Sequence, residues 1–529
     1  MSDELDFLSR HVVRGRLSRR DFLGRAAALG VSATFANSLL ASAARAQGPV
    51  KGGTLKAGMQ GGESTNSLDP ASFLSQVPFN FGKCWGEYLC RLNRDGSIQN
   101  LIAEEIGASD DATTWTMKIK QGVEFHNGKT LTAEDVAATL ERHTNEESKS
   151  GALGIMKGIT GIKASGNEVI VELAEADADF PYLMADYHLI IQPNGGKDNP
   201  AEGVSAGPYK VVVNEPGVRY VGEKFANYWG GDAMGHADTV EIVVINDATA
   251  RTSALQGGQV HMINRVEPKI VSLVERVAGV TIQNVAGRGF YPFNMFCDTP
   301  PFDNNDLRMA LKLAMNREEL LDKILFGYGS VGNDFPINEA YPLFPEGIEQ
   351  RTFDPEAAAA AYKKSGHSGS IVLRTSDVAF PGAVDAAQLY QQSCAQAGIT
   401  IEIKREPGDG YWSEVWNKQP FSLSYWGGRS TQNQFYSTAL LSTADWNDTR
   451  WKRPEFDKML LTARAELDED KRKAIYRDMA IMLRDEGGVI VPFFNEFIDA
   501  TTDKVGGYEK HPAAELMDGY ALAECWVAA

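Results

Sequence analysis

The feature that most restricts the fold is a mixture of strand-like and helix-like hydrophobic patterns along nearly the whole chain. Apolar and polar side chains alternate at 115–119, 168–173, 240–245 and 399–404, a spacing of two that is typical of half-buried strands. No period of 20 to 50 residues repeats, which argues against solenoid and propeller folds. The sequence therefore predicts a mixed α/β fold.

Helix start and stop signals lie between the strand-like segments. Thr132 and Asp135 have the spacing of a capping box, in which the first side chain caps the helix and the second reaches back. Asp354 and Pro355 predict an N-cap and a first-turn proline, and they open an alanine-rich helix that Gly366 can end.

Length and charge limit the size of the fold and the kind of partner. A chain of 529 residues is long enough for about three structural units with separate cores. It carries 52 Lys plus Arg and 70 Asp plus Glu, so its formal charge is 52 − 70 = −18. A negative field of this size repels phosphate backbones and anionic membranes, so we expect no nucleic-acid partner.

The first 46 residues have the order of a secretory leader. A paired arginine, Arg19-Arg20, precedes an apolar run at 26–40 and a small-residue cleavage site that ends at Ala46. The pair indicates export by the twin-arginine (Tat) route to the periplasm, so we expect the mature chain to begin at Gln47. The alternative is a membrane anchor, but the run has about 15 residues, shorter than the ~20 that a spanning helix needs.

The five cysteines form neither a CxxC motif nor a zinc-like spacing. Cys84 and Cys90 could pair in an oxidising compartment. Proteins exported by the Tat route usually fold before export in a reducing cytosol, so two buried thiols is the interpretation that we prefer.

Two literal matches to catalytic motifs lack the structural context that their chemistry needs. The GxSxG match at 203–207 runs into a strand-like segment, whereas a nucleophile elbow turns from a strand into a helix. The GxGxxG match at 327–332 follows a predicted helix at 318–325, which favours glycine capping over a dinucleotide site. No P-loop, HExxH or EF-hand motif is present. We therefore expect binding rather than catalysis, with no catalytic residue, metal or cofactor.

A set of short motifs occurs in a fixed order between residues 51 and 500. The set comprises Gly52-Gly53-Thr54-Leu55, Ser67-Leu68-Asp69-Pro70, the run 115–136, Ala206-Gly207-Pro208-Tyr209, Asn227-Tyr228-Trp229-Gly230-Gly231, Phe293-Asn294, Pro301-Phe302-Asp303, Leu307-Arg308-Met309-Ala310-Leu311 and Pro454-Glu455-Phe456-Asp457. Together these segments resemble the family 5 solute-binding proteins of ABC importers, the group that binds dipeptides, oligopeptides and nickel.

The resemblance implies a two-lobed periplasmic binding protein of the large type, with an extra subdomain and a ligand cleft between the lobes. Carried over, it places lobe I at 47–85, 201–289 and 491–529, an inserted subdomain at 86–200 and lobe II at 290–490. It implies a monomeric receptor that captures a small molecule or short peptide by lobe closure and delivers it to an ABC permease in the inner membrane. The rival hypothesis is a periplasmic enzyme or chaperone on the same scaffold.

One departure from the family pattern bears on the ligand. Dipeptide binders of this family have a Trp-x-Gly-Asp segment whose carboxylate meets the α-amine of the peptide, and the matching run here is Trp426-Gly427-Gly428-Arg429. Arginine reverses the charge and suits forked bonding to a carboxylate or phosphate. We expect Arg429 to meet an anionic group of the ligand. The alternative is that Arg429 pairs internally with Asp445 or Glu414, or points to solvent.

Aromatic side chains are unusually dense between 411 and 436, and aromatic faces stack on sugars and on peptide planes. Further candidates near the lobe edges complete the expected binding set. The ligand-binding candidates are Arg429, Trp426, Gly428, Tyr436, Arg374, Trp412, Asn294 and Asn66. The expected ligand is a short peptide or a carboxylated, sugar-like conjugate such as an opine.

Overall fold

A computed structural model describes residues 48–466 and 468–528, together with positions 5, 8, 17 and 19–29. Helix α2 (Arg19–Ala28) contains the paired arginine of the expected leader. The cleavage site expected at Ala46 and most of the apolar run before it lie outside the described residues. Among the helices that are described, none combines the length and the apolar character needed to cross a membrane.

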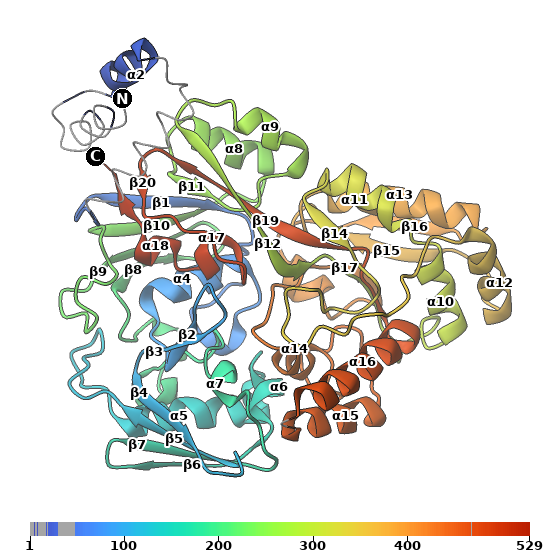
Figure 1. The fold of residues 1–529 in the computed structure, drawn as a ribbon, viewed down its shortest axis with the longest axis horizontal. Coiled ribbons are helices and arrows are strands. Elements are labelled where there is room, and N and C mark those ends of the chain that lie inside the picture. Colours follow the sequence, from blue (N-terminus) through green and yellow to red (C-terminus); the bar gives the residue numbers. More distant parts are fainter. Residues whose placement is uncertain are drawn as a thin grey trace.

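The first lobe is built on a mixed sheet with the strand order β12-β19-β11-β1-β10-β9-β8 (Figure 1). Its strands are β1 (Thr54–Met59), β8 (Tyr209–Glu215), β9 (Arg219–Lys224), β10 (Thr239–Val244), β11 (Met262–Ile263), β12 (Val280–Phe290) and β19 (Phe493–Thr502), with β14 (Gly329–Val331) added on β19. Its helices are α4 (Gln76–Trp85), α8 (Ala248–Gln256), α9 (Val271–Val274), α17 (Glu515–Asp518) and α18 (Ala521–Glu524), and the short strands β20 (Val505–Gly506) and β21 (Trp526–Val527) pair near the end of the chain. Helix α4 packs on this sheet and buries an apolar stripe against it.

A separate four-stranded antiparallel sheet has the order β4-β5-β7-β6 and its own hydrophobic core. Its elements are β4 (Ala103–Ala108), β5 (Thr114–Ile119), α5 (Ala133–Thr144), α6 (Leu153–Met156), β6 (Ile159–Ser165), β7 (Glu168–Leu173) and α7 (Phe180–Leu183), preceded by the hairpin β2 (Cys90–Leu92) and β3 (Ile98–Asn100). The capping box predicted at Thr132 and Asp135 is confirmed, because each side chain bonds the backbone N–H of the other.

The second lobe has a five-stranded sheet with the order β16-β15-β17-β13-β18, packed by helices. The strands are β13 (Phe293–Met295), β15 (Ile371–Thr375), β16 (Ile401–Arg405), β17 (Phe421–Leu423) and β18 (Val489–Ile490). The helices are α10 (Asn305–Leu313), α11 (Arg317–Leu325), α12 (Pro355–Ser365), α13 (Ala383–Gln396), α14 (Gln432–Ala439), α15 (Pro454–Ala465) and α16 (Glu469–Glu486), and Tyr411–Val415 forms one turn of π-helix. Asp354 caps α12 and Gly366 ends it in the left-handed conformation, as predicted.

Two neighbouring chain crossings connect the lobes. Strands β12 and β19 pair antiparallel from Val280 opposite Thr502 to Phe290 opposite Phe494. Within a few residues each strand reaches the second sheet, since β13 follows β12 and β18 precedes β19. The lobes are therefore joined by a pair of strands, the arrangement in which a few residues can absorb a hinge motion.

The GxSxG and GxGxxG matches, which lack a catalytic context in the sequence, are also structural segments in the fold. Ser205 of the GxSxG match is fully buried and its hydroxyl donates to the carbonyl of Ile191 over 2.6 Å, so it is no exposed nucleophile. The GxGxxG match follows α11, but the left-handed cap is Phe326 with φ 51°, and Gly327 comes after it. The expected glycine cap was thus misplaced by one residue, and the half-exposed Phe326 takes the left-handed position.

All five cysteines are free thiols, and Cys84 and Cys90 are buried. Burial raises the pKa of the Cys90 thiol to about 12. The prediction of two buried thiols is confirmed.

Candidate functional site

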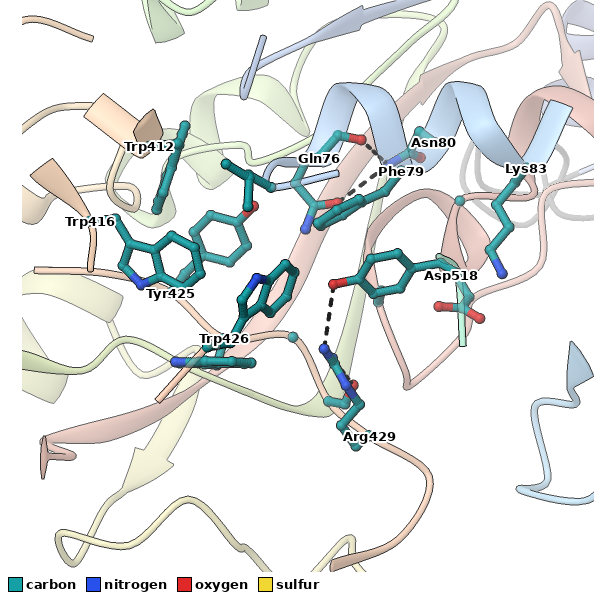
Figure 2. A pocket seen from close by; sticks show the side chains of 17 residues that line it. Gln76, Phe79, Asn80, Lys83, Trp412, Trp416, Tyr425, Trp426, Arg429 and Asp518 are labelled. Carbon is teal, nitrogen blue, oxygen red and sulfur yellow. Dashed lines mark hydrogen bonds between the residues drawn. The ribbon is translucent and has the colours of Figure 1, made fainter. Parts of the chain in front are cut away.

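A cavity of about 710 Å³, partly open to solvent, lies between the two lobes. Figure 2 shows Trp412, Trp416 and Trp426 on one side of it and Lys83 and Asp518 on the other. From the first lobe and its small sheet the lining comprises Leu74, Gln76, Phe79, Asn80, Lys83, Tyr187, Ala514, Asp518 and Gly519. From the second lobe it comprises Trp412, Trp416, Tyr425, Trp426, Gly427, Gly428, Arg429 and Trp446.

Arg429 is a buried cation at the cavity, with 8% of its surface exposed. Its Nη1 donates to the carbonyl of Gly428 over 3.1 Å and its Nη2 to the hydroxyl of Tyr187 over 3.4 Å. These polar contacts in the described part of the chain do not involve the carboxylates of Glu414 or Asp445. Its Nε is buried without a hydrogen-bond partner among the described residues. The cation is therefore held by ring, hydroxyl and carbonyl groups, and one of its donors has no partner among the described residues.

The charge on Arg429 is stable in this setting. Burial lowers its pKa, but Tyr187, Asp186 and Tyr341 raise the pKa above the ordinary arginine value. Burial also raises the pKa of Asp186, yet a 2.6 Å hydrogen bond with His188 and the nearby Arg429 bring it down to about 2. The Asp186 carboxylate is hydrogen-bonded to His188, and its effect on Arg429 is electrostatic.

The second-lobe wall is made of tryptophans that meet edge to face. Ring centroids are 5.4 Å apart for Trp416 and Trp446, 5.8 Å for Trp426 and Trp446, and 6.3 Å for Trp416 and Trp426. Edge-to-face pairs of this kind stabilise one another beyond their burial. The result is a rigid aromatic surface at the mouth of the second lobe.

Three further polar atoms of the lining are buried without a partner among the described residues. They are the indole nitrogen of Trp412, a donor, the side-chain oxygen of Asn80, an acceptor, and the hydroxyl of Tyr425, which can be either. A buried polar atom without a partner costs about 1–3 kcal/mol.

Lys83 and Asp518 bring opposite charges to the first-lobe side. Burial lowers the pKa of Lys83, and Asp518 opposes that shift. The lysine Nζ lies 4.2 Å from the ring centroid of Tyr88 and 4.7 Å from that of Tyr520. With these two charges offsetting each other, Arg429 remains as the excess charge of the lining.

Contacts between the lobes flank the cavity near the π-helical turn. The backbone N–H of Trp412 donates to Glu63 over 2.8 Å, and the hydroxyl of Ser64 donates to Asp409 over 3.0 Å. These pairs join the first lobe to the second.

A second group of contacts links the small sheet to the second lobe. Arg472 of α16 pairs with Asp179 over 2.6 Å, and the amide of Asn433 donates to Asp177 over 3.1 Å. With both flanks joined, the structure is a closed arrangement of the lobes.

The sequence-predicted residues divide into two groups. Arg429, Trp426, Gly428 and Trp412 line the cavity. The other four do not: Tyr436 packs against Phe456 in the core, Asn294 bonds Asp448 behind the tryptophans, Arg374 pairs with Glu406, and Asn66 accepts a backbone N–H from Glu63.

Sequence reasoning missed the first-lobe half of the lining. Gln76, Asn80 and Lys83 are buried polar residues on α4, and such polar positions on an otherwise apolar helix face are the signal that was available. Tyr187 had no such signal. No group of three or more potential metal ligands occurs among the described residues.

Comparison with known proteins identifies the family of the chain. The family described as "Bacterial extracellular solute-binding proteins, family 5 Middle" matches residues 97–448, well over half of the chain. The glutathione-binding protein GsiB of Pectobacterium atrosepticum is 23% identical over 478 residues, which cover 85% of this chain and 91% of that protein. The dipeptide-binding protein of Escherichia coli is 21% identical over 451 residues, with coverage of 78% and 83%.

Solved structures share the fold. The periplasmic binding protein DppA from Helicobacter pylori in complex with the peptide STSA matches with a TM-score of 0.82 and 18% identity, over 92% of this chain and 100% of that chain. AgaA from A. tumefaciens in complex with agropinic acid matches with a TM-score of 0.83 and 21% identity, over 90% and 99%. The predicted two-lobed α/β fold is confirmed.

Proposed function

The chain belongs to the bacterial extracellular solute-binding proteins of family 5, and from this premise we propose that it is the periplasmic receptor of an ABC importer. It captures one small solute between its lobes and delivers it to a membrane permease. The leader with Arg19-Arg20 supports Tat export and cleavage at Ala46. The mature receptor acts as a monomer, with its hinge at the paired strands β12 and β19 and with lobe boundaries at 86, 201, 290 and 491.

The ligand carries a carboxylate or another anionic group. The observation that supports this is the placement of Arg429, a buried cation at the cavity whose Nε has no partner among the described residues and whose two hydrogen bonds there go to a carbonyl and a hydroxyl. A like-charged ammonium desolvated at this point would cost several kcal/mol. This chemistry differs from that of a site built to hold the amino end of a dipeptide.

The remaining lining favours a small solute with apolar or sugar-like faces. Aromatic rings from both lobes surround the cavity. A carboxylated, sugar-like conjugate such as an opine fits these walls. A short peptide is the second candidate, and Asp518 favours it because its carboxylate can receive an ammonium group.

Binding proceeds without chemical turnover. In the described part of the chain the cavity lining holds no cysteine, histidine or serine, and its one lysine, Lys83, lies beside its one carboxylate, Asp518. Capture therefore consists of lobe closure over the solute.

Isothermal titration of residues 47–529 tests this proposal with three probes: agropinic acid, glutathione and the dipeptide Met-Leu. An anionic probe that binds with one-to-one stoichiometry and is recovered unchanged supports it. Binding confined to Met-Leu, a zwitterion without net charge, contradicts the anionic ligand class and favours the second candidate, a short peptide. Conversion of a bound probe contradicts the receptor assignment and favours an enzyme on this scaffold.

A further inference from the structure

Asp448 lies directly behind the tryptophan wall and is outside the cavity lining. It is 4% exposed, and one of its oxygens, Oδ2, accepts three hydrogen bonds. The indole nitrogens of Trp416 and Trp426 donate to it over 2.9 and 3.0 Å, and the amide of Asn294 donates over 2.7 Å. Three separate segments thus converge on a single carboxylate oxygen.

This convergence determines which edge of each indole is available to a ligand. An indole has one hydrogen-bond donor, its Nε1–H. In Trp416 and Trp426 that donor is used behind the wall, although both rings line the cavity. Trp412 lines the same cavity with its indole nitrogen free of any partner among the described residues. The cavity is therefore lined, in the described part of the chain, by two tryptophan rings whose donors are used behind the wall, next to the unpartnered donors of Trp412, Tyr425 and Arg429.

We infer that Asp448 is a positioning residue for ligand recognition: it fixes the Trp416 and Trp426 rings so that they present no donor to the solute. The solute then lies with its C–H face on these two rings and its acceptors toward Trp412 and Arg429. This inference rests on the proposed function in taking the cavity as the ligand site. Charge-assisted hydrogen bonds are strong enough to hold the rings in one orientation.

The geometry gives Asp448 this role more clearly than a role in general stability. Its three partners are uncharged, so it completes no ion pair, and burial raises its pKa to about 6. A buried carboxylate without a cation is a cost to folding. Two of its three hydrogen-bond donors are tryptophans of the cavity wall, where the orientation of the rings matters for recognition.

The indole N–H signals of the full mature chain, followed by ¹H–¹⁵N NMR, test the positioning directly. The chain has nine tryptophans, and Trp416→Phe and Trp426→Phe each assign one signal. In Asp448→Asn we expect both N–H groups to exchange with solvent about tenfold faster or more, because a charge-assisted hydrogen bond is lost. Unchanged exchange at both signals overturns the inference.

Glu87 supplies a matched control. It accepts the indole N–H of Trp229 over 2.7 Å in the first lobe, and it does not line the cavity. Glu87→Gln is expected to change the Trp229 signal and to leave those of Trp416 and Trp426 in place. If Glu87→Gln perturbs the Trp416 and Trp426 signals as strongly as Asp448→Asn does, the effect is a general loosening of the fold, and the inference fails.

Affinity for agropinic acid, glutathione and Met-Leu links the position of the rings to recognition. Asp448→Asn is expected to weaken the affinity for whichever probe binds by about tenfold. In a chain that already carries Trp416→Phe and Trp426→Phe, it should cause no further loss of affinity. An equal loss in both backgrounds contradicts positioning through the tryptophans. If no probe binds the unmodified chain, the proposed ligand class fails, while the exchange measurement still decides the role of Asp448.

Discussion

The guanidinium carbon of Arg429 lies 5.5 Å from the ring centroid of Tyr187, and its Nη2 lies 3.4 Å from the hydroxyl oxygen of that tyrosine. Arg429 belongs to a loop of the second lobe, and Tyr187 follows the small sheet of the first. The pair therefore forms only when the lobes are closed. A ligand anion bound at Arg429 would lie beside this contact between the two lobes.

Arg429→Gln is expected to weaken binding of an anionic solute by about 10- to 100-fold, because hydrogen bonds to a charged group contribute about 1.5–3 kcal/mol. Arg429→Asp should abolish binding, since it places a negative charge against the anion. Tyr187→Phe, which removes only the hydroxyl contact, serves as the control and should cost much less. Titration calorimetry measures all three, and unchanged affinity in Arg429→Asp would rule out this role.

Gly428 and Gly427 form a matched pair for the loop that carries Arg429. A Cβ at Gly428 would lie 2.6 Å from the Cβ of Arg288, whereas a Cβ at Gly427 meets nothing within 4 Å. Gly428→Ala should therefore displace the loop and weaken ligand binding about tenfold, while Gly427→Ala should stay close to the unmodified chain. Equal affinities of the two variants would show that the loop is not held by this contact.

Arg472 and Asp179 form an ion pair across the lobes, with 2.6 Å between Nη2 and Oδ2. Arg472→Ala should favour the open arrangement, weaken ligand affinity by about 5- to 30-fold and increase the radius of gyration of the ligand-free chain in X-ray scattering. Lys473→Ala, on the same helix but paired with Glu346 within the second lobe, is the control. An identical radius and affinity in both variants would exclude a role for the pair in closure.

Asp448 gives a pH dependence with a definite sign. Burial raises its folded-state pKa from 3.8 to about 6, so between these values the folded chain holds a proton that the unfolded chain has released. Its contribution to stability is therefore greatest below pH 4 and falls as the pH rises through 6. An asparagine has no carboxyl group to titrate, so Asp448→Asn does not lose stability in this way. The free energy of unfolding of the variant minus that of the unmodified chain should therefore increase by up to about 3 kcal/mol from pH 4 to 7. Urea unfolding at several pH values checks this, and a constant difference would contradict it.

Local sequence signals predicted local structure well. The caps at Thr132 and Asp354 and the stop at Gly366 depend on neighbouring residues only, so they could be identified from spacing. The two-lobed fold followed from a set of ordered motifs, since the same segments recur in a family with that architecture. The cap at Phe326 was missed because the preference for glycine in the left-handed conformation pointed to Gly327, one residue further on.

The site was only half predictable, for a reason of geometry. Trp426 and Arg429 are neighbours in one loop, so a single motif indicated both. Asn80 and Tyr187 reach the same cavity from distant parts of the chain, and no local pattern connects them. Asn294 carries the polar group expected at a cleft, but the strand directs it to Asp448 behind the wall.

Selection of an anionic solute by the cavity depends, as we propose, on Arg429. Native mass spectrometry can test this with the mature chain and Arg429→Gln, each gently purified from its own cells and then incubated with the three-probe panel. We expect a one-to-one complex with a single small anion in the unmodified chain and its loss in the variant. A complex with a neutral or cationic solute, or equal retention of the anion by Arg429→Gln, would show that Arg429 does not select the ligand.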